Sequence, residues 1–178
     1  MVSAVILCGG KATRLRPVTQ TIPKAMVKVN GKPIIDHQLE WLEKNGITNV
    51  VLACGYKWKV LKQHLGNRVK YSVENKPRGT GGALRYALEL IESQDAVVLN
   101  GDNLSDISLE RMIKTDLMFP NVALVKFRCP YGVYRSGHFE EKPLLDVWIN
   151  AGVYYFSKTA INDFINMMVS LSLSINFF

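Results

Sequence analysis

The sequence predicts an α/β fold, namely a Rossmann-like, doubly wound and mainly parallel sheet with an antiparallel extension near its C-terminal end. In the N-terminal two thirds of the chain, short apolar runs of strand length alternate with segments of helical periodicity. Such alternation is typical of parallel sheets whose faces are covered by helices. From Val122 onward the chain becomes rich in β-forming residues, which we expect to add antiparallel strands to the same sheet.

The strand predicted at 3–8 is a nearly continuous apolar run, as expected of a strand that is buried on both faces. The helix predicted at 33–44 starts on a proline, repeats apolar residues at helical spacing and ends before Asn45-Gly46. The remaining elements expected in this part are strands at 48–54, 69–74 and 96–99 and helices at 58–65, 83–91 and 109–115.

The C-terminal part is predicted to contain β-rich segments at 122–127, 131–139 and 147–156 and a helix near 158–166. Residues 170–175 alternate between serine and an apolar residue, a period of two that predicts a half-buried strand. No charged residue follows Asp163. Because an uncharged strand can pair with the edge of a second copy, this C-terminal tail is a candidate surface for a homo-oligomer.

The composition bounds the class of protein. A chain of 178 residues with 48% hydrophobic residues is long enough for one domain with a sizeable core. Its three cysteines are widely spaced and odd in number, which favours reduced thiols over a disulfide framework. There is neither a signal-peptide pattern nor an uncharged stretch long enough to span a bilayer. These features predict a cytoplasmic protein without a membrane partner.

Positive charge is concentrated near the N-terminus. The formal net charge is +7, and no acidic residue precedes Asp36. The cations of that segment are Lys11, Arg14, Arg16, Lys24, Lys28 and Lys32. A focused positive field attracts anions, either nucleic acid or small phosphates. Because the segment has neither a basic helix nor interleaved aromatic residues, we expect phosphates rather than nucleic acid.

A glycine-containing loop follows the first predicted strand directly and begins at Leu7. Gly9 and Gly10 allow the backbone to approach a phosphate and to point N–H groups at it. Thr13 adds a hydroxyl donor and Arg14 a bidentate fork. The loop is not a P-loop, because no Gly-Lys-Ser/Thr follows, and it lacks the third glycine of a dinucleotide fingerprint. Ligands of open parallel sheets bind at the C-terminal strand ends, where this loop is expected.

These motifs resemble those of the sugar-1-phosphate nucleotidyltransferases (NDP-sugar pyrophosphorylases), and most of all the mannose-1-phosphate guanylyltransferase-like members. The family opens with Gly-Gly-x-Gly-Thr-Arg-Leu-x-Pro. This chain reads Gly-Gly-Lys-Ala-Thr-Arg-Leu-Arg-Pro from Gly9 onward, followed by Pro-Lys at 23–24 and Gly-Lys-Pro at 31–33. Ala12 stands where relatives have glycine, which we expect to stiffen the loop without removing a donor side chain.

The resemblance implies a base-reading segment at 74–83, which reads Glu-Asn-Lys-Pro-Arg-Gly-Thr-Gly-Gly-Ala. Gly79 and Thr80 would bring backbone against the base, and Glu74 would meet its edge. A carboxylate only accepts hydrogen bonds, so it pairs better with N1–H and the 2-amino group of guanine than with uracil or thymine. This favours GTP. The alternatives are uridylyl or thymidylyl transfer to glucose-1-phosphate, and a Glu74 that is only a charge at a strand end.

An Asn-Gly-Asp sequence at 100–102 ends the predicted strand at 96–99. A carboxylate at the C-terminal end of a strand, in the crevice of the sheet, suits Mg²⁺ that is also held by phosphate oxygens. Asp102 is therefore the predicted metal ligand and a predicted catalytic residue. The alternative is an aspartate that merely stabilises a tight turn.

Two further motifs match the sugar-binding side of the family. Glu141 and Lys142 belong to a Glu-Lys-Pro tripeptide. In relatives, the lysine of this tripeptide binds the sugar phosphate and the glutamate binds a sugar hydroxyl. Asn150 and Gly152 belong to an Asn-Ala-Gly segment that contacts the sugar in relatives. The resemblance thus implies one domain at 1–178, with a nucleotide-binding half at 1–120 and a sugar-phosphate-binding half at 121–178 that covers a cleft of sugar size.

The implied reaction is attack of a sugar-1-phosphate oxygen on the α-phosphorus of a nucleoside triphosphate, which releases pyrophosphate. Arg14 and Lys24 would be catalytic by facing the pyrophosphate, and Lys142 would hold the sugar phosphate. Relatives supply a second carboxylate for Mg²⁺ from a Trp-x-Asp-Ile-Gly-type segment, which this chain lacks. We therefore expect a truncated sugar-binding half and impaired activity, or a member that only binds nucleotide or NDP-sugar and regulates a full-length partner.

Overall fold

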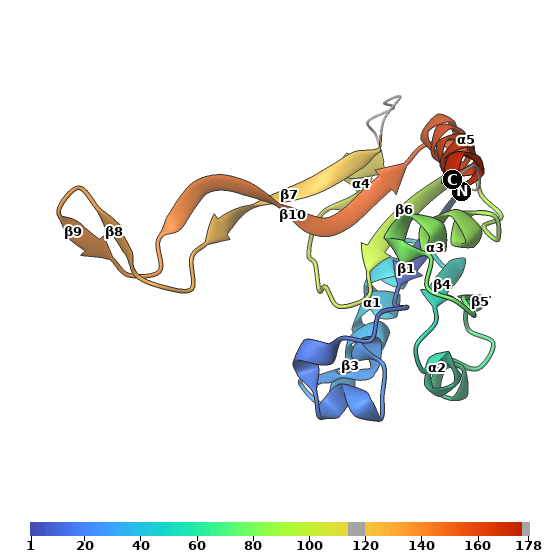
Figure 1. Ribbon diagram of the computed structural model, residues 1–178, viewed down its shortest axis with the longest axis horizontal. Coiled ribbons are helices and arrows are strands. Elements are labelled where there is room, and N and C mark those ends of the chain that lie inside the picture. The colour runs from blue at the N-terminus through green and yellow to red at the C-terminus, as the bar shows by residue number, and fades with distance from the viewer. Residues whose placement is uncertain (114–119, 176–178) are drawn as a thin grey trace.

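The computed structural model of the protein describes residues 1–113 and 120–175, with side chains as far as residue 168. Its centre is a six-stranded sheet in the order β5-β4-β1-β6-β10-β7. The strands are β1 (Val2–Leu7), β4 (Val50–Cys54), β5 (Lys70–Val73), β6 (Asp95–Asn100), β7 (Asn121–Arg128) and β10 (Leu144–Phe156). β1, β4, β5 and β6 are parallel, whereas β10 runs antiparallel to β6 and β7. The predicted fold class is confirmed (Figure 1).

Helices cover both faces of this sheet. They are α1 (Ile34–Lys44), α2 (Trp58–Leu65), α3 (Gly79–Leu88), α4 (Leu109–Ile113) and α5 (Lys158–Ile175). Ile35 of α1 and Leu61 of α2 belong to one buried apolar cluster, and Leu84 of α3 and Ile161 of α5 belong to a second. The two clusters lie on opposite faces of the sheet because neighbouring residues of a strand point to opposite sides. This is the doubly wound arrangement.

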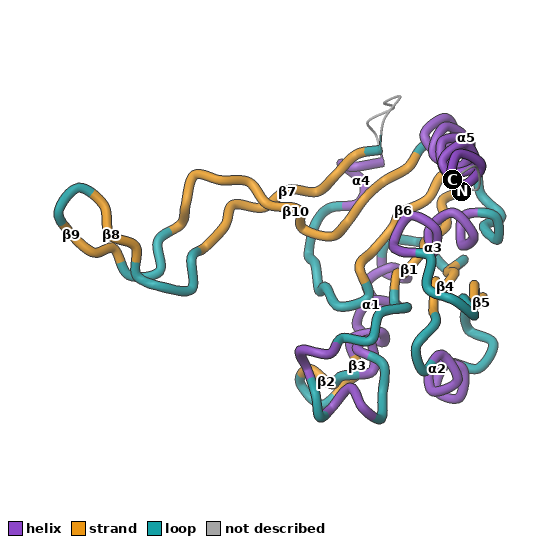
Figure 2. The backbone as a smooth tube through the Cα atoms, in the orientation of Figure 1, coloured by secondary structure: helices purple, strands orange, loops and turns teal. Residues whose placement is uncertain are grey.

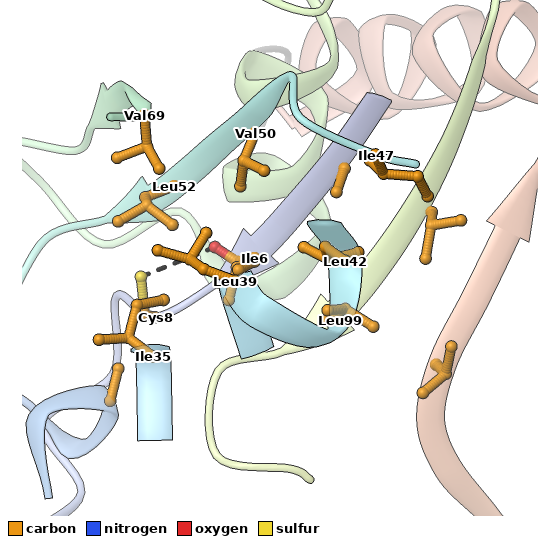
Figure 3. Packing of buried hydrophobic residues seen from close by; sticks show 14 of the residues in the cluster. Ile6, Cys8, Ile35, Leu39, Leu42, Ile47, Val50, Leu52, Val69 and Leu99 are labelled. Carbon is orange, nitrogen blue, oxygen red and sulfur yellow. Dashed lines mark hydrogen bonds between the residues drawn. The ribbon is translucent and has the colours of Figure 1, made fainter. Parts of the chain in front are cut away.

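The first strand shows how the two clusters share the sheet. Ala4 and Ile6 belong to the first cluster and Val5 to the second, and none of the three is exposed at all. Figure 3 shows Ile6 among Leu39 and Leu52 in the first cluster. Complete burial of a residue such as Ile6 stabilises the fold by about 1.5–3 kcal/mol. The prediction of a strand buried on both faces is confirmed.

Short elements fill the chain between β1 and α1. Three single turns of 3-10 helix are η1 (Thr13–Leu15), η2 (Val18–Gln20) and η3 (Lys24–Met26). They are followed by a small hairpin of β2 (Lys28–Val29) and β3 (Lys32–Pro33). Figure 2 shows these turns and the hairpin together at one end of the sheet, so the cation-rich segment forms a compact unit there.

The antiparallel extension continues far beyond the body of the protein as a two-stranded arm (Figures 1 and 2). β7 pairs with β10 from Asn121–Tyr155 at its base to Arg128–Leu144, with register shifts on the way. Beyond it lies a separate hairpin of β8 (Val133–Arg135) and β9 (His138–Glu140). The β-rich segment predicted at 131–139 is therefore split, because its Ser-Gly pair at 136–137 adopts positive φ and forms the turn.

The predicted strand at 170–175 is wrong, because these residues form the end of α5. Ser157 lies just before this helix and caps its N-terminus, because its hydroxyl accepts a hydrogen bond from the backbone N–H of Ala160 at 3.3 Å. Phe164 packs against the second cluster and against the ring of Phe156. Once this face is anchored, adding residues to a helix is favourable, and no proline or glycine interrupts the segment. The helix therefore continues through residues 170–175, although their alternation of serine and apolar residues is typical of a strand. The final phenylalanines lie outside the described residues.

The three cysteines are free, as the composition predicts. Cys8 and Cys54 are buried, and Cys129 is half-buried. Burial raises the pKa of both buried thiols, and for Cys54, with a further contribution from the charge of Glu74, it raises the pKa to about 12. Both therefore stay protonated and serve as core groups. None of the helices in the described part of the chain is both long and apolar enough to cross a membrane.

Candidate nucleotide-binding site

The C-terminal ends of β1, β5 and β6 meet at one edge of the sheet, and the predicted site residues follow directly after them. The backbone N–H of Gly101, after β6, donates to the carbonyl of Leu7 at 2.9 Å. A Cβ at position 101 would lie 2.7 Å from that carbonyl, so only glycine permits this approach. The backbone N–H of Glu74, after β5, donates to the carbonyl of Cys54 at 2.9 Å. The topology thus brings together segments that are far apart in the sequence.

Two adjoining cavities lie at this edge. The larger, of about 340 Å³, is bordered by both glycine-containing loops and by the ends of the strands. Its predicted site residues are Leu7, Gly9, Gly10, Glu74, Gly79, Thr80 and Asp102. The smaller, of about 240 Å³, shares Leu7, Gly10 and Asp102 with it and adds Ala12 and Lys24. The sequence-based grouping of these residues matches their placement, while the role of each residue stays a prediction.

Lys24 and Asp102 form an ion pair between the two cavities. The ammonium group of Lys24, at the start of η3, hydrogen-bonds to Oδ2 of Asp102. Their side chains are 38% and 35% exposed, so both groups can still be reached from solvent. No cluster of three or more metal-ligating side chains occurs within the described ranges. Asp102 would therefore need phosphate oxygens and water as further ligands, a set that is usual for Mg²⁺ bound together with a nucleotide.

Glu74 carries a carboxylate oxygen without a partner. Its Oε1 atom is buried, and no hydrogen-bond donor within the described residues reaches it. Its other oxygen lies beside the Gly9 loop, 3.7 Å from the position that a Cβ on Gly9 would take. A buried acceptor without a donor costs about 1–3 kcal/mol, a cost that a ligand with N–H groups would remove. Glu74 also lines the larger cavity, so its carboxylate has unused acceptor capacity at the edge of that cavity.

Thr13 and Arg14 lie at the rim rather than in the cavities. Both belong to η1 and are exposed, and neither lines the two cavities described above. The residue before them, Ala12, lines the smaller cavity and adopts a left-handed conformation with φ 46° and ψ 49°. Its carbonyl accepts a hydrogen bond of 2.8 Å from the hydroxyl of buried Thr19, which holds the loop in this shape.

Replacing Ala12 with glycine is expected to raise the free energy of unfolding by about 1 kcal/mol, because a left-handed conformation is costly for alanine and not for glycine. Lys57→Gly provides a matched control, since Lys57 has φ 52° and does not line either cavity. Urea unfolding of both variants measures the effect. A loss of stability in Ala12→Gly alone would mean that contacts of the alanine outweigh the strain.

The Asn150–Gly152 segment reaches the loop that carries Asp102. The side-chain amide of Asn103 donates to the carbonyl of Ala151 at 2.7 Å. The N–H of Gly152 donates to Oδ1 of Asn150 at 2.7 Å, and Gly152 has φ 71°. A Cβ on Gly152 would overlap the side chain of Asn103. Asn150 and Gly152, two of the four residues predicted to bind the sugar phosphate, therefore lie next to the loop that carries Asp102.

Gly152→Ala is expected to lower the free energy of unfolding by about 2–4 kcal/mol, because both the positive φ and the overlap with Asn103 are unfavourable. Gly137→Ala is the matched control. Gly137 has φ 93° but open space around it, so only the conformational cost of about 1 kcal/mol should appear. Thermal or urea unfolding distinguishes the two, and equal losses would show that the close approach at position 152 is unimportant.

Glu141 and Lys142 do not lie with the other site residues. They pair with each other at 3.8 Å on the arm, with side chains 76% and 63% exposed. Figure 1 shows the hairpin next to them at the end of the arm that is farthest from the body. The expectation that residues 121–178 cover the cavity is thus not met by this part of the arm, because β7 and β10 stay paired and carry it outward.

One supporting residue was missed by the sequence analysis. Gln38 lies in α1 but is only 3% exposed, and its side-chain N–H groups donate to the carbonyls of Asn100 at 2.8 Å and Asn103 at 2.7 Å. It thereby fixes both ends of the loop that presents Asp102. The available signal was its spacing, since Gln38 follows Ile35 by three residues and so lies on the buried stripe of the helix.

Comparison with known proteins agrees with this geometry. Residues 3–173 match the family described as nucleotidyl transferase. The chain belongs to this family. It is 36% identical to a D-glycero-alpha-D-manno-heptose 1-phosphate guanylyltransferase from Campylobacter jejuni, over 90% of this chain and 78% of that protein. It is 37% identical to mannose-1-phosphate guanyltransferase beta-B from Xenopus laevis, over 89% of this chain but only 51% of that protein.

A solved structure of the family has the same fold. HddC from Yersinia pseudotuberculosis, crystallised with GMP-PN, superposes with a TM-score of 0.73 at 32% identity, over 92% of this chain and 80% of that one. The resemblance inferred from the glycine-containing loops is therefore confirmed at the level of the family. The two relatives named above are described as sugar-1-phosphate guanylyltransferases.

Proposed function

We propose that this protein transfers a guanylyl group from GTP to a sugar-1-phosphate, giving a GDP-sugar and pyrophosphate. The observation that carries the choice of base is the buried Oε1 of Glu74, an acceptor without a donor in a cavity lined by glycine-containing loops. Guanine offers N1–H and the 2-amino group on one edge, whereas uracil and thymine offer only one N–H there. The names of the relatives support the same base and favour heptose- or mannose-1-phosphate as the acceptor.

The cations of the site fit the charge changes of this reaction. The attacking phosphate oxygen is already an anion, so the step needs no general base, and charge builds up on the departing pyrophosphate. Catalysis then consists of holding the reactants in line and stabilising that charge. In this proposal Lys24, at the smaller cavity, and Arg14, on the rim, face the pyrophosphate, while Gly9 and Gly10 offer their backbone N–H groups.

Asp102 is the residue that would hold Mg²⁺. It borders both cavities, so a metal bound to it could also be ligated by the phosphates of a nucleotide in the larger one. The metal would supply positive charge to the phosphate oxygens when bound. The ammonium group of Lys24 forms an ion pair with the same carboxylate. Lys24 must therefore turn away from Asp102 before it can face pyrophosphate.

On the sugar side, Asn150 and Gly152 would contact the sugar, and Glu141 and Lys142 would bind a hydroxyl and the phosphate. The first pair is supported by its position on either side of Ala151, whose carbonyl accepts a hydrogen bond from Asn103 in the Asp102 loop. The second pair is supported by its chemistry alone, since a lysine suits a phosphate and a carboxylate suits a hydroxyl.

Pyrophosphate release tests the proposal. Purified protein with Mg²⁺ is incubated with each pair of GTP, ATP, UTP or dTTP and mannose-1-phosphate, heptose-1-phosphate or glucose-1-phosphate. We expect release with GTP and one of the first two sugars. A preference for UTP or dTTP with glucose-1-phosphate would overturn the choice of base. Binding of GTP without any release would instead indicate a member that binds nucleotide but does not turn it over.

A further inference from the structure

Little apolar packing holds the loop from Gly9 to Thr19. Thr19 is only 1% exposed, whereas every residue from 9 to 18 is exposed or half-buried, and Leu15 is 41% exposed. A segment with few buried apolar contacts can open locally at a low cost in free energy. The shape of this loop therefore depends on its hydrogen bonds.

Tyr56 joins both ends of this loop to the sheet. It comes shortly after β4, whose residues are all buried, and lies in the turn before α2. Its backbone N–H donates to the carbonyl of Gly9 at 3.2 Å, and its phenolic hydroxyl donates to the carbonyl of Thr19 at 3.0 Å. One residue thus fixes the first and the last residue of the loop relative to a strand in the interior of the sheet.

A third hydrogen bond extends this connection toward the cavities. The hydroxyl of Thr19 donates to the carbonyl of Ala12 at 2.8 Å, and Ala12 lines the smaller cavity. All three bonds use carbonyl oxygens of the loop as acceptors. They therefore do not compete with a phosphate, which needs N–H groups and cations as donors.

We propose that Tyr56 is a positioning residue for the transfer reaction, because it holds the Gly9–Thr19 loop where Arg14 and the backbone N–H groups can meet the triphosphate. Tyr56 lines neither cavity, so it acts through the loop and not by contact with the nucleotide. This inference rests on the proposed function for what the loop binds. The hydrogen bonds that hold the loop do not depend on that function.

Tyr56→Phe tests the phenolic hydroxyl, since the variant keeps the ring and removes only the donor to Thr19. We expect kcat with GTP and a sugar-1-phosphate to fall by about tenfold, because a shift of about 1 Å in groups that align reactants can cost about 100-fold. KM for GTP should change by less than about twofold, because in the proposed site the base is bound by residues 74–83. Steady-state kinetics separate the two parameters. An unchanged kcat, with or without a change in KM, overturns the positioning role.

Tyr71→Phe is the matched control. Tyr71 lies on β5 and lines neither cavity, and its hydroxyl donates to the carbonyl of Gly66 at 2.9 Å. Both substitutions remove one phenolic donor to a backbone carbonyl, so both should lower the urea midpoint by a similar amount. Only Tyr56→Phe should lower kcat. An equal fall of kcat in Tyr71→Phe would assign the effect to overall stability and contradict the proposal.

Thr19 tests whether the hydrogen bonds act in series. Thr19→Val removes the hydroxyl that reaches Ala12, whereas Thr19→Ser keeps it. The valine variant should lose kcat as Tyr56→Phe does, and the serine variant should stay within about twofold of the wild type. Because either loss frees the same loop, the double variant of Tyr56→Phe and Thr19→Val should lose little more than one of them alone. Losses that multiply would mean that the two hydroxyls act independently, against the proposed connection.

Limited proteolysis provides a readout that needs no activity. Trypsin cleaves after lysine and arginine, and Lys11 and Arg14 are exposed on the loop. When the loop opens and closes faster than it is cut, the rate of cleavage follows the population of the open form. Loss of one hydrogen bond should raise this rate at both residues by about 3–10-fold in Tyr56→Phe, but not in Tyr71→Phe. Mass spectrometry identifies the positions of cleavage.

The outcomes separate this inference from the proposed function. Cleavage of the loop at the wild-type rate in Tyr56→Phe overturns the inference, whether or not the protein is active. Faster cleavage in a protein that releases no pyrophosphate with any substrate pair supports the hold of Tyr56 on the loop and removes the proposed reaction. Faster cleavage together with a lower kcat supports both.

Discussion

Replacing Lys24 with alanine is expected to lower kcat/KM for GTP and a sugar-1-phosphate by about 10²–10³, the usual effect of losing one preorganised charged donor. Lys24 is the cation that the structure places at the cavities, where it meets Asp102. The loss should appear mainly in kcat, because charge on the leaving pyrophosphate develops in the transition state rather than in the bound substrate. Steady-state kinetics at saturating Mg²⁺ measure it.

Lys28→Ala is the control for the change in net charge. Lys28 lies four residues further along the same cation-rich segment, is exposed in β2 and lines neither cavity. The Lys28→Ala variant should change kcat/KM by less than about threefold, since screening by salt weakens the field of an exposed charge. Similar losses in both variants would mean that the segment acts through its overall field, and Lys24 would then have no special role.

Replacing Glu74 with glutamine is expected to reduce kcat/KM for GTP by about 10–100-fold, the discrimination that one good bidentate base contact provides. The glutamine has almost the same shape, but it turns one acceptor into a donor that faces the N–H groups of guanine. The values for UTP and dTTP should fall much less, so the preference for GTP shrinks. A competition assay with mixed nucleotides measures this directly.

The stability of the Glu74→Gln variant separates binding from folding. The buried Oε1 of Glu74 has no donor within the described part of the chain, so its replacement removes no hydrogen bond from the folded protein. The melting temperature of the nucleotide-free variant should therefore not fall. An equal loss of activity with every nucleotide, together with a lower melting temperature, would assign Glu74 to the fold and not to the base.

Local patterns were sufficient to predict most of the sheet, and together with the family resemblance they predicted the nucleotide side of the site. The run at 3–8 and the apolar spacing of α1 each match a single type of element, and a parallel sheet brings the C-terminal strand ends to one edge. For that reason Gly9, Glu74 and Asp102 could be grouped in advance although their segments are far apart in the chain. The pairing of Lys24 with Asp102 was not predicted, because Lys24 lies in η3 and not at the end of a strand of the sheet.

Other features depend on contacts that local patterns do not contain. The direction of the arm depends on how far β7 and β10 stay paired, so Lys142 could not be placed. The C-terminal segment alternates like a strand, but packing of Phe164 anchors a helix that continues through it. Gln38 was missed because its role requires the loop between Asn100 and Asn103 to lie against α1.

The contact between Lys24 and Asp102 has a consequence for how a nucleotide enters. Because Lys24 and Asp102 neutralise each other, the net charge of the residues that line the two cavities is the negative charge of Glu74, which does not attract a triphosphate. For the nucleotide binding proposed above, the cations that would attract a triphosphate are those exposed on the loop after Gly10, at Lys11, Arg14 and Arg16. Binding would therefore begin at the entrance of the cavities, and a cation that replaced Lys24 on Asp102 would free the lysine to meet the phosphates.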